Sequence, residues 1–328
     1  MIFIKFEKGQ GLGNQLWHYV TLRSIAKYKS YDYGVLDYHN FKGLKFIEIE
    51  KSNKAFNEFK SINEKINNFY ETIFYDRDLN NYSCDYDKKI LEISDDTILN
   101  GLFQSEKYIV SKKEEINNFI KLKKNKIFIN EDLDKLCILN VRGGEYKRHK
   151  NLILPKSYWT NAIKNMRRFY PNLIYKIVTD DYRYAERLLP GIDIIKGDIS
   201  SDFNLLNKAK YLIISNSSFS YFPITMGNYP NIVISPFCWS RFGNKYNRWS
   251  SPANCYKNFT WQDHQGNIVS KKQLDFSLLN TRKEFEKYNI RTENKNLNFR
   301  NRTIIFLPTK IRRFIKYILS LLFPLKYG

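Results

Sequence analysis

The sequence predicts an α/β fold with parallel sheets covered by helices on both faces, and three observations lead to this class. Short apolar segments alternate with helical patterns through the second half of the chain. A strand at the start runs into a glycine-rich turn and then a helical pattern. The 328 residues, 43% of them hydrophobic, are enough for two domains of ordinary size.

The first part of the chain begins regularly and then loses its pattern. In chain order we expect a strand at 2–6, a helix at 15–28, a strand near 34–37, a strand ending in a turn at 98–104 and a charged helix at 112–124. The stretch between 37 and about 90 is rich in Asn, Lys and Glu, and its weak signals indicate helices and loops.

The second part alternates strands with helices, which is typical of a parallel sheet. We expect strands at 137–142, 174–179, 192–195, 211–215 and 232–235, and helices at 155–170, 182–189 and 202–209. We therefore divide the chain into a first domain at 1–130, a second domain at 131–290 and a tail at 291–328.

Polar residues follow three strands of the second part, at the edge where a parallel sheet binds its ligands. The segments are Arg142 to Tyr146, Asp180-Asp181 and Ser215 to Ser218. An arginine, two acids and a group of hydroxyls at one sheet edge predict a pocket for a phosphate and a sugar.

Each of these residues also has a plainer interpretation. Arg142 is suited to grip a diphosphate with two hydrogen bonds, or it forms a surface ion pair with Glu145. Asp180 and Asp181 hold a ribose or a base, or one of them caps the next helix. Phosphate binding and a Ser-rich helix start are both open for Asn216, Ser217, Ser218 and Ser220.

The opening turn, Gly9 to Leu16, places glycines at the start of a helix, where free N–H groups face anions. Its spacing matches neither the dinucleotide-binding Gly-x-Gly-x-x-Gly nor a phosphate loop that ends in Gly-Lys-Ser/Thr. The pattern alone leaves a phosphate or sugar site and a structural turn both open.

No pattern in the sequence indicates a bound metal or a serine hydrolase. Asp-x-Asp pairs occur at 76–78, 85–87 and 132–134, but none follows an apolar strand. The four cysteines form no Cys-x-x-Cys pair, the four histidines have no ligand spacing, and a Gly-x-Ser-x-Gly elbow is absent. We expect neither a metal nor another cofactor, so cationic side chains would neutralise a leaving phosphate.

The formal charge of +21 favours polyanions such as nucleic acid, anionic lipid or phosphorylated substrates. A biased genome composition explains the abundant lysine equally well. Because the chain contains no recognisable nucleic-acid module, we expect no nucleic-acid partner. A non-enzymatic polyanion-binding protein is the less favoured alternative.

Four segments in order resemble the motifs of glycosyltransferase family 11, the bacterial α-1,2-fucosyltransferases, and more distantly the wider α-1,2-, α-1,6- and protein O-fucosyltransferases. They are Gly11-Leu12-Gly13-Asn14-Gln15-Leu16, Gly101-Leu102-Phe103-Gln104-Ser105-Glu106-Lys107-Tyr108, Asn140-Val141-Arg142-Gly143-Gly144-Glu145-Tyr146 and the block from Asp202-Phe203 to Ser220, with Pro236-Phe237-Cys238-Trp239 after it. The likeness covers about residues 1 to 250.

The resemblance implies a GT-B-like fold, in which two Rossmann-like domains face a cleft and the second binds the nucleotide. It also implies an inverting, metal-independent transfer of L-fucose from GDP-fucose to a hydroxyl of a surface glycan, such as an O-antigen, a capsule or a lipooligosaccharide. On this basis Arg142 binds the diphosphate. The other implied donor-site residues are Gly11, Gly13, Asn14 and Gln15 from the first domain and Asp180, Asp202, Asn216, Ser217, Ser218 and Phe219 from the second.

The chain departs from the family in the third segment, where Asn140, Gly143 and Glu145 replace a histidine, an arginine and an aspartate. The missing arginine removes a charge-assisted contact worth on the order of 1.5–3 kcal/mol from the donor pocket. Either Lys147 or Arg148 compensates, or the donor is a different nucleotide sugar. Glu145 is a candidate base for the acceptor proton, or only the partner of a nearby arginine.

The tail is basic and amphipathic. Residues 290–328 carry nine Lys or Arg and one acid, and after Pro308 apolar residues recur at helical spacing. The apolar run at 314–325 is too short to cross a bilayer, which takes about 20 residues. We expect residues 304–325 to lie on an anionic membrane, which suits a lipid-linked glycan acceptor, or to pack on the protein's own core.

The start of the chain has no signal-peptide pattern. Together with the basic tail, this predicts a cytoplasmic protein that is peripheral on the inner face of the plasma membrane.

Overall fold

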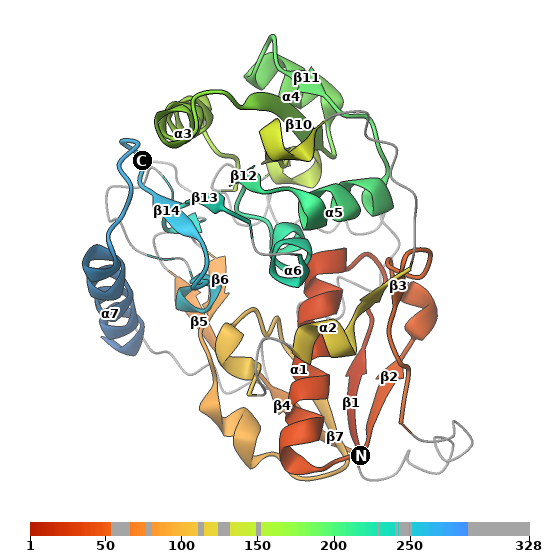
Figure 1. Ribbon diagram of the computed structural model, residues 1–328. Coiled ribbons are helices and arrows are strands. Elements are labelled where there is room, and N and C mark those ends of the chain that lie inside the picture. Colours follow the sequence, from red (N-terminus) through yellow and green to blue (C-terminus); the bar gives the residue numbers. More distant parts are fainter. Residues whose placement is uncertain are drawn as a thin grey trace, which may run out of the picture.

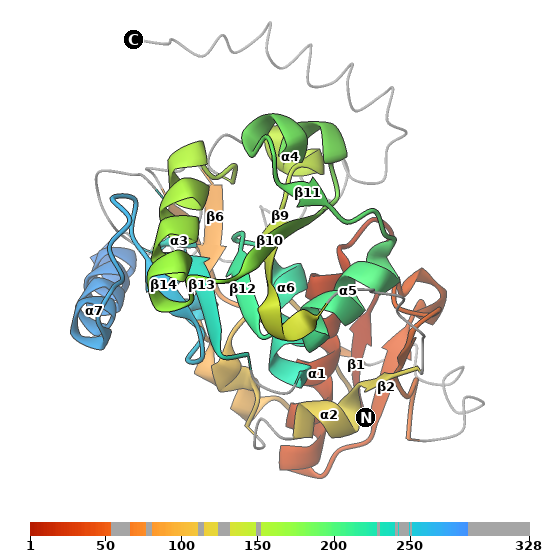
Figure 2. The same ribbon diagram turned by 45° about the horizontal axis from the view of Figure 1, so that its top comes forward.

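The computed structural model describes residues 1–53, 66–76, 81–110, 115–123, 132–148, 152–227, 230–239, 242, 249 and 251–287. Within these residues the chain forms two parallel sheets flanked by helices (Figures 1 and 2). The strand order is β2-β1-β7-β4 in the first sheet and β11-β10-β9-β12-β13-β14 in the second. The predicted α/β class with two parallel sheets is confirmed.

The first sheet lies in the N-terminal part, shown in red and orange in Figure 1. Its strands are β1 (Ile2–Lys5), β2 (Tyr33–Leu36), β4 (Asn67–Tyr70) and β7 (Thr97–Asn100). The helices of this part are α1 (Leu12–Lys29) and α2 (Ile116–Phe119). Two small antiparallel pairs accompany them, β3 (Ile47–Glu48) with β8 (Lys121–Leu122) and β5 (Ile73–Asp76) with β6 (Asn81–Cys84).

The second sheet has the strand order of dinucleotide-binding folds. Its strands are β9 (Leu136–Val141), β10 (Ile174–Thr179), β11 (Asp193–Ile194), β12 (Tyr211–Ile214), β13 (Ile232–Pro236) and β14 (Thr260–Gln262). Its helices are α3 (Lys156–Phe169), α4 (Tyr182–Leu188), α5 (Ile199–Lys208), α6 (Ser218–Met226) and α7 (Lys271–Lys287). The chain leaves β9 toward β10 on one side and returns to β12 on the other, so the topological switch point lies between β9 and β12.

Two predictions for the first part are wrong. In place of a helix at 112–124, the described residues 115–123 contain the short helix α2, which ends at Phe119, and then β8. The stretch from 37 to 90 contains the strands β3 to β6 where helices and loops are predicted. These strands have two to four residues each, so they are too short to show an alternating pattern.

One core joins the two sheets. A single cluster of buried apolar side chains includes Ile2 and Ile4 of β1 and also Leu212 and Ile214 of β12. At the centre of the contact, Trp17 of α1 stacks on Tyr221 of α6 with ring centroids 4.3 Å apart, and Trp17 also stacks on Tyr256 at 5.7 Å. The sheets are therefore held by packed aromatic rings as well as by the chain that connects them.

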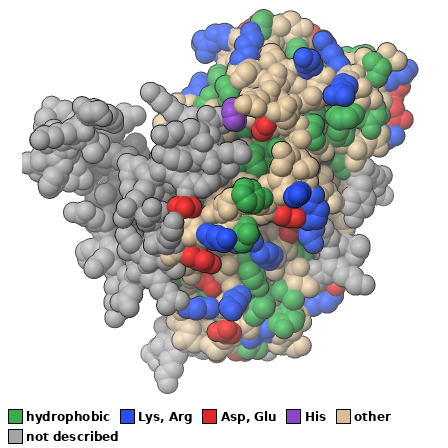
Figure 3. Space-filling model, turned by 90° about the vertical axis from the view of Figure 1, so that its left-hand side faces the viewer, with side chains coloured by type: hydrophobic (Ala, Val, Ile, Leu, Met, Phe, Trp, Pro, Cys, Tyr) green, Lys and Arg blue, Asp and Glu red, His purple; other side chains and the backbone are tan. Residues whose placement is uncertain are grey.

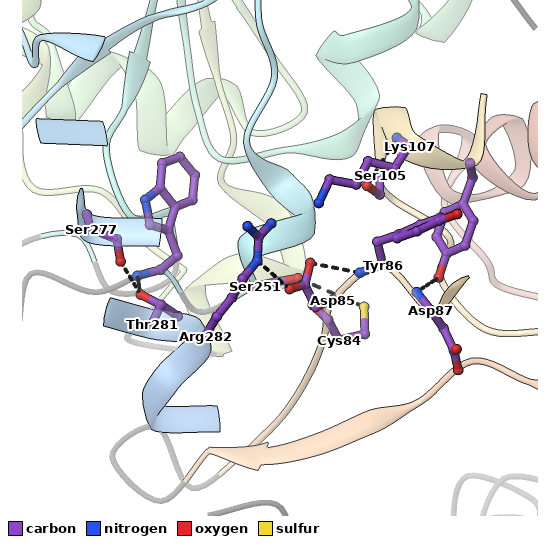
Figure 4. A network of polar contacts seen from close by, with 12 residues as sticks. Cys84, Asp85, Tyr86, Asp87, Ser105, Lys107, Ser251, Ser277, Thr281 and Arg282 are labelled. Carbon is purple, nitrogen blue, oxygen red and sulfur yellow. Dashed lines mark hydrogen bonds and ion pairs between the residues drawn. The ribbon is translucent and has the colours of Figure 1, made fainter. Parts of the chain in front are cut away.

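The last part of the described chain packs back onto the first part, as Figure 4 shows. Arg282 of α7 donates from Nε to Asp85 Oδ2 at 2.9 Å, and Ser251 Oγ donates to the carbonyl oxygen of Cys84. Phe285 of α7 stacks on Phe74 of β5 at 5.1 Å. Residues 251–287 thus contact both halves. The boundary predicted between residues 130 and 131 stays a prediction.

The predicted tail at 291–328, with its membrane-binding segment at 304–325, lies outside the described residues. Among the described helices, none is both long enough and apolar enough to cross a membrane. On the face seen in Figure 3, Lys and Arg side chains alternate with acidic and hydrophobic ones. The described residues of this face therefore form no continuous basic patch.

Candidate functional site

A cavity of about 300 Å³ lies at the carboxyl ends of β9, β10, β11 and β12, next to the switch point. This is the place where open parallel sheets bind their ligands. Its lining combines charged, polar and apolar side chains from four connections of the sheet: Asn140, Val141, Arg142, Thr179, Asp180, Tyr182, Gly197, Ile199, Asp202, Ser217 and Phe219. Five of the predicted site residues, Arg142, Asp180, Asp202, Ser217 and Phe219, thus meet in one cavity.

Arg142 is the cation that lines this cavity among the described residues. Its Nη1 lies 2.8 Å from Asp180 Oδ2, and its Nη2 lies 3.4 Å from Glu145 Oε1. Its Nε is buried and has no hydrogen-bond partner. The guanidinium also lies 5.3 Å from the centre of the Tyr146 ring. Arg142 is therefore held from several sides and still has an unused N–H donor.

In the structure Glu145 is an ion-pair partner of Arg142, which is one of the two roles that the sequence predicts for it. Its carboxylate pairs with Arg142, and 69% of its side chain is exposed. It does not line the cavity. The geometry thus agrees with an ion-pair partner, and a role as the base stays a prediction.

The two glycines after Arg142 allow the acids of the next strand to approach closely. A Cβ at Gly143 would lie 2.8 Å from both Asp181 Cβ and Tyr184 Cδ1. A Cβ at Gly144, whose φ is +37°, would collide with Asp180 Oδ2. The Gly143 N–H also donates to Asp180 Oδ1 at 2.8 Å. An arginine at position 143 therefore has no room in this arrangement.

Asp181 has a structural role. Its Oδ1 accepts from the N–H of Tyr184 at 3.1 Å and so caps α4. Helix capping is one of the two roles that the sequence predicts for the pair Asp180-Asp181. Lys147 forms an ion pair with its Oδ2 and holds the pKa of this carboxyl below its ordinary value. Lys147 is thus paired with Asp181 and does not line the cavity, so it does not replace the arginine that is missing at position 143.

Asp202 is the titratable group of the cavity that departs furthest from its usual behaviour. Burial, with the nearby negative charges of Asp198 and Asp180, raises its pKa to about 7. Asp198 caps α5 through Ser201, so Asp202 is left in the first turn of α5 with its carboxyl at the cavity. A carboxyl that titrates near neutrality and lines a cavity is a candidate functional group.

Among the hydroxyl residues predicted at the start of α6, Ser217 lines the cavity, whereas Ser220 Oγ donates to the Ser217 carbonyl. Ser217 caps α6 by accepting from the Phe219 N–H at 3.4 Å, and both residues line the cavity. Asn216 is buried, and neither polar atom of its side chain has a hydrogen-bond partner. Buried amides are normally paired, so Asn216 is able to bind a ligand or a water molecule.

The glycine turn packs directly against this helix start. Gly13 lies so close to Ser218 that a Cβ at position 13 would collide with the Ser218 backbone. Asn14 Oδ1 accepts a hydrogen bond from Ser218 Oγ at 2.7 Å. Gly11 is exposed and precedes α1. The glycine turn of the first half therefore contacts the start of α6 in the second half, next to the cavity-lining residues Ser217 and Phe219.

Gln15 does not lie where the resemblance implies. Its side chain is fully buried, its Nε2 donates to the Asn40 carbonyl at 2.8 Å, and its Oε1 accepts from the Lys42 N–H at 2.9 Å. Both ends of the amide are used to hold the loop after β2, so Gln15 has a structural role in this arrangement.

The sequence prediction missed the apolar wall of the cavity. Tyr182 and Ile199 line it, and they are 38% and 40% exposed. Both follow strand ends, but a tyrosine and an isoleucine at the start of a helix carry no functional signal in sequence. Within the described part of the chain, no group of three or more His, Cys, Asp or Glu side chains is placed to hold a metal ion.

No protein-family model matches the chain. The chain is 25% identical over 162 residues to an α-1,2-colitosyltransferase from Escherichia coli, which is 42% of this chain and 54% of that enzyme. The alignment thus spans about half the length of the curated relative. This similarity confirms the resemblance that the four sequence segments indicate.

Two solved structures are similar in outline. One is the fucosyltransferase NodZ from Bradyrhizobium, with a TM-score of 0.42 and 15% identity over 69% of this chain and 92% of that one. The other is the E. coli heptosyltransferase WaaC with ADP, with a TM-score of 0.39 and 9% identity over 87% of this chain and 99% of that one. Both TM-scores lie below 0.5, so the proposals below do not depend on them.

Proposed function

We propose that this protein is a glycosyltransferase that moves a deoxyhexose, L-fucose or a related sugar, from a GDP-linked donor to a hydroxyl group of a surface glycan. The observation that carries the proposal is the cavity at the switch point, where Arg142 and the start of α6 meet. The relative that transfers colitose in an α-1,2 linkage supports the class of reaction. The linkage formed here is accordingly α-1,2.

The donor diphosphate binds at Arg142 and the N-terminus of α6 in this proposal. The guanidinium has an unpaired Nε–H, and Ser217 brings a hydroxyl and helix N–H groups to the same cavity. As the glycosidic bond of the donor breaks, charge builds up on the leaving diphosphate, and Arg142 stabilises it without a metal. The acceptor hydroxyl attacks the opposite face of the sugar, which inverts its configuration, and its proton passes to a carboxylate base, for which Glu145 is the candidate.

Asp202 gives a reason for the choice of guanine. The Watson–Crick edge of guanine presents an N–H and an NH₂ group side by side, and an ionised carboxylate accepts from both. Phe219, Ile199 and Tyr182 offer apolar surface for the base. Adenine, uracil and cytosine lack this pair of neighbouring donors, so we expect weaker binding of their nucleotides.

The first test is a calorimetric titration with GDP, UDP, CDP and ADP in the absence of metal, for the wild type and for Arg142→Ala. We expect GDP to bind most tightly and the variant to lose about tenfold or more in affinity. Arg168→Ala removes the same charge from α3, away from the cavity, and should bind GDP like the wild type. Equal affinity for all four nucleotides, or binding unchanged by Arg142→Ala, would contradict the proposal.

A second candidate is a transferase of the same architecture with another nucleotide-sugar donor. Position 143 has no arginine and no room for one, and Lys147 is paired with Asp181. If this candidate is right, the same titration shows a clear preference for UDP, CDP or ADP, still dependent on Arg142.

We also propose that residues 304–325 bind an anionic membrane on its cytoplasmic side, which would bring the enzyme to a lipid-linked acceptor. The support is the sequence pattern of the tail. The full chain should float with vesicles that contain anionic lipid and not with neutral vesicles. Lys310→Glu combined with Arg313→Glu should abolish flotation and leave GDP affinity unchanged; flotation that persists in this variant speaks against the proposal.

A further inference from the structure

A line of side-chain hydrogen bonds joins four segments that are far apart in the sequence. Asn14 Oδ1 accepts from Ser218 Oγ and from Gln104 Nε2, each at 2.7 Å. Gln104 Oε1 in turn accepts from Asn254 Nδ2 at 3.0 Å. The line therefore connects the turn after β7 with the start of α1, the start of α6 and the 3₁₀ turn at Pro252–Asn254. At the start of α6 it lies next to the cavity-lining residue Ser217.

These contacts fix the direction of the Asn14 carboxamide. Two donors hold its oxygen, so a reversed amide would place an NH₂ group against Gln104 Nε2. The Asn14 nitrogen is then left without a partner among the described residues. Because an amide nitrogen only donates, Asn14 offers a hydrogen-bond donor to an acceptor atom of a ligand.

Gln104 is held in turn by a constrained stretch of backbone. Phe103, the residue before it, has a φ of +51°, in the left-handed region that side chains other than glycine seldom adopt. The buried carboxylate of Glu71 accepts from the N–H groups of Leu102 and Phe103 at 2.7 and 3.0 Å and from the Tyr108 hydroxyl at 2.8 Å. These buried hydrogen bonds hold the backbone before Gln104 in one conformation and so fix the position of Gln104.

We propose that Gln104 is a positioning residue for the donor site. It holds the Asn14 amide so that Asn14 Nδ2 donates to a phosphate oxygen of the nucleotide that lies against the start of α6. The inference rests on the proposed function, since it requires a nucleotide in the cavity. Gln104 belongs to the second of the four sequence segments, and its sequence pattern indicates no role for it.

A double-mutant cycle on GDP affinity tests the proposal. Gln104→Leu should weaken GDP binding about tenfold, because the Asn14 amide loses the donor that orients it. Asn14→Ala should weaken it to a similar or greater extent. The double variant should bind like Asn14→Ala alone, because Gln104 acts through Asn14 and has nothing left to position.

Glu106→Gln is the matched control. Glu106 lies in the same turn and also reaches the other half, accepting from the Tyr221 hydroxyl at 3.1 Å and the Lys257 N–H at 3.2 Å. Its replacement disturbs a contact between the halves without touching Asn14, so GDP affinity should stay at the wild-type level. Thermal unfolding of each variant measures folding separately from binding.

Two results would overturn the positioning role. One is a further loss of affinity when Gln104→Leu is added to Asn14→Ala, which would show an independent effect. The other is an equal loss in Glu106→Gln, which would show a general effect of loosening the contact between the halves. A wild type that binds none of GDP, UDP, CDP and ADP would overturn the proposed function itself and this inference with it.

Discussion

At the scale of single residues, the geometry of the site depends on two glycines, because a side chain at either position would collide with a neighbour. Gly143 and Gly144 let Asp180 and Asp181 approach the loop that carries Arg142. Asp180 uses one carboxylate oxygen for Arg142 and the other for the Gly143 N–H. The acid therefore fixes the loop and its arginine together, and the glycines make this geometry possible.

Gly144→Ala should disrupt this arrangement. The new Cβ would meet Asp180 Oδ2, and the positive φ adds strain, so we expect a loss of about 1–3 kcal/mol in the free energy of unfolding. GDP affinity should fall as well, because Arg142 shifts with the loop. Urea unfolding measures the first effect, with Gly11→Ala, which has open space around its Cβ, as the stability control. Equal stability of the two variants would contradict this account.

The raised pKa of Asp202 predicts a pH dependence of binding. Only the ionised carboxylate accepts from guanine, so GDP affinity should rise about tenfold per pH unit up to about 7, where Asp202 titrates, and level off above it. Phosphate groups of GDP also titrate, and Asp202→Asn corrects for them because they are the same in both titrations. The ratio of wild-type to variant affinity should therefore rise with pH up to about 7 and then stay constant. A ratio that is flat between pH 5.5 and 8.5 would show that Asp202 does not bind the base.

At the scale of elements, the turn after β7 shows how a buried acid fixes the conformation of a loop. Burial raises the pKa of Glu71 to about 7, above its ordinary value of 4.5. The folded protein therefore holds this proton more tightly than the unfolded chain does. The stability that the group contributes is fully present below about pH 4.5 and is lost as the pH rises through 7.

Glu71→Gln should remove this dependence. An amide oxygen still accepts from the Leu102 and Phe103 N–H groups, and the side chain no longer ionises. Between pH 5 and pH 8 the wild type should therefore lose about 2 kcal/mol relative to the variant. Urea unfolding at the two pH values gives this difference directly, and other titrating groups cancel between the two proteins. A constant difference across the range would mean that Glu71 stays ionised when folded.

The elements also show what the sequence could and could not predict. The strand ends at Arg142, Asp180 and Ser217 were predictable because each follows an apolar run that stops at polar residues. The strands β3 to β6 were not, since each has only two to four residues. In addition, β3 and β4 form by pairing with the distant strands β8 and β7. Gln15 looks like a site residue in its motif, and only the fold reveals that both ends of its amide are used by the backbone.

At the scale of the whole molecule, the two sheets share one core. The rings of Trp17, Tyr221 and Tyr256 form its centre, and α7 adds an ion pair and a stacked ring from the far end of the described chain. A second cluster, which includes Trp159, lies only in the second half. The shared core holds the cavity of the second half and Asn14 of the first in a fixed geometry, which the proposed role of Asn14 in donor binding requires.

This packing predicts that the two halves unfold together. Calorimetry of the wild type should show one cooperative transition, because breaking either half exposes the aromatic contact. Trp17→Ala should remove about 3–5 kcal/mol and separate the unfolding of the halves into two transitions. Trp159→Ala empties a similar volume in the second cluster, so it should lower the midpoint and keep a single transition. Two transitions in the wild type, or the same response in both variants, would mean that the halves are stable independently and that the geometry between Asn14 and α6 is not set by the core.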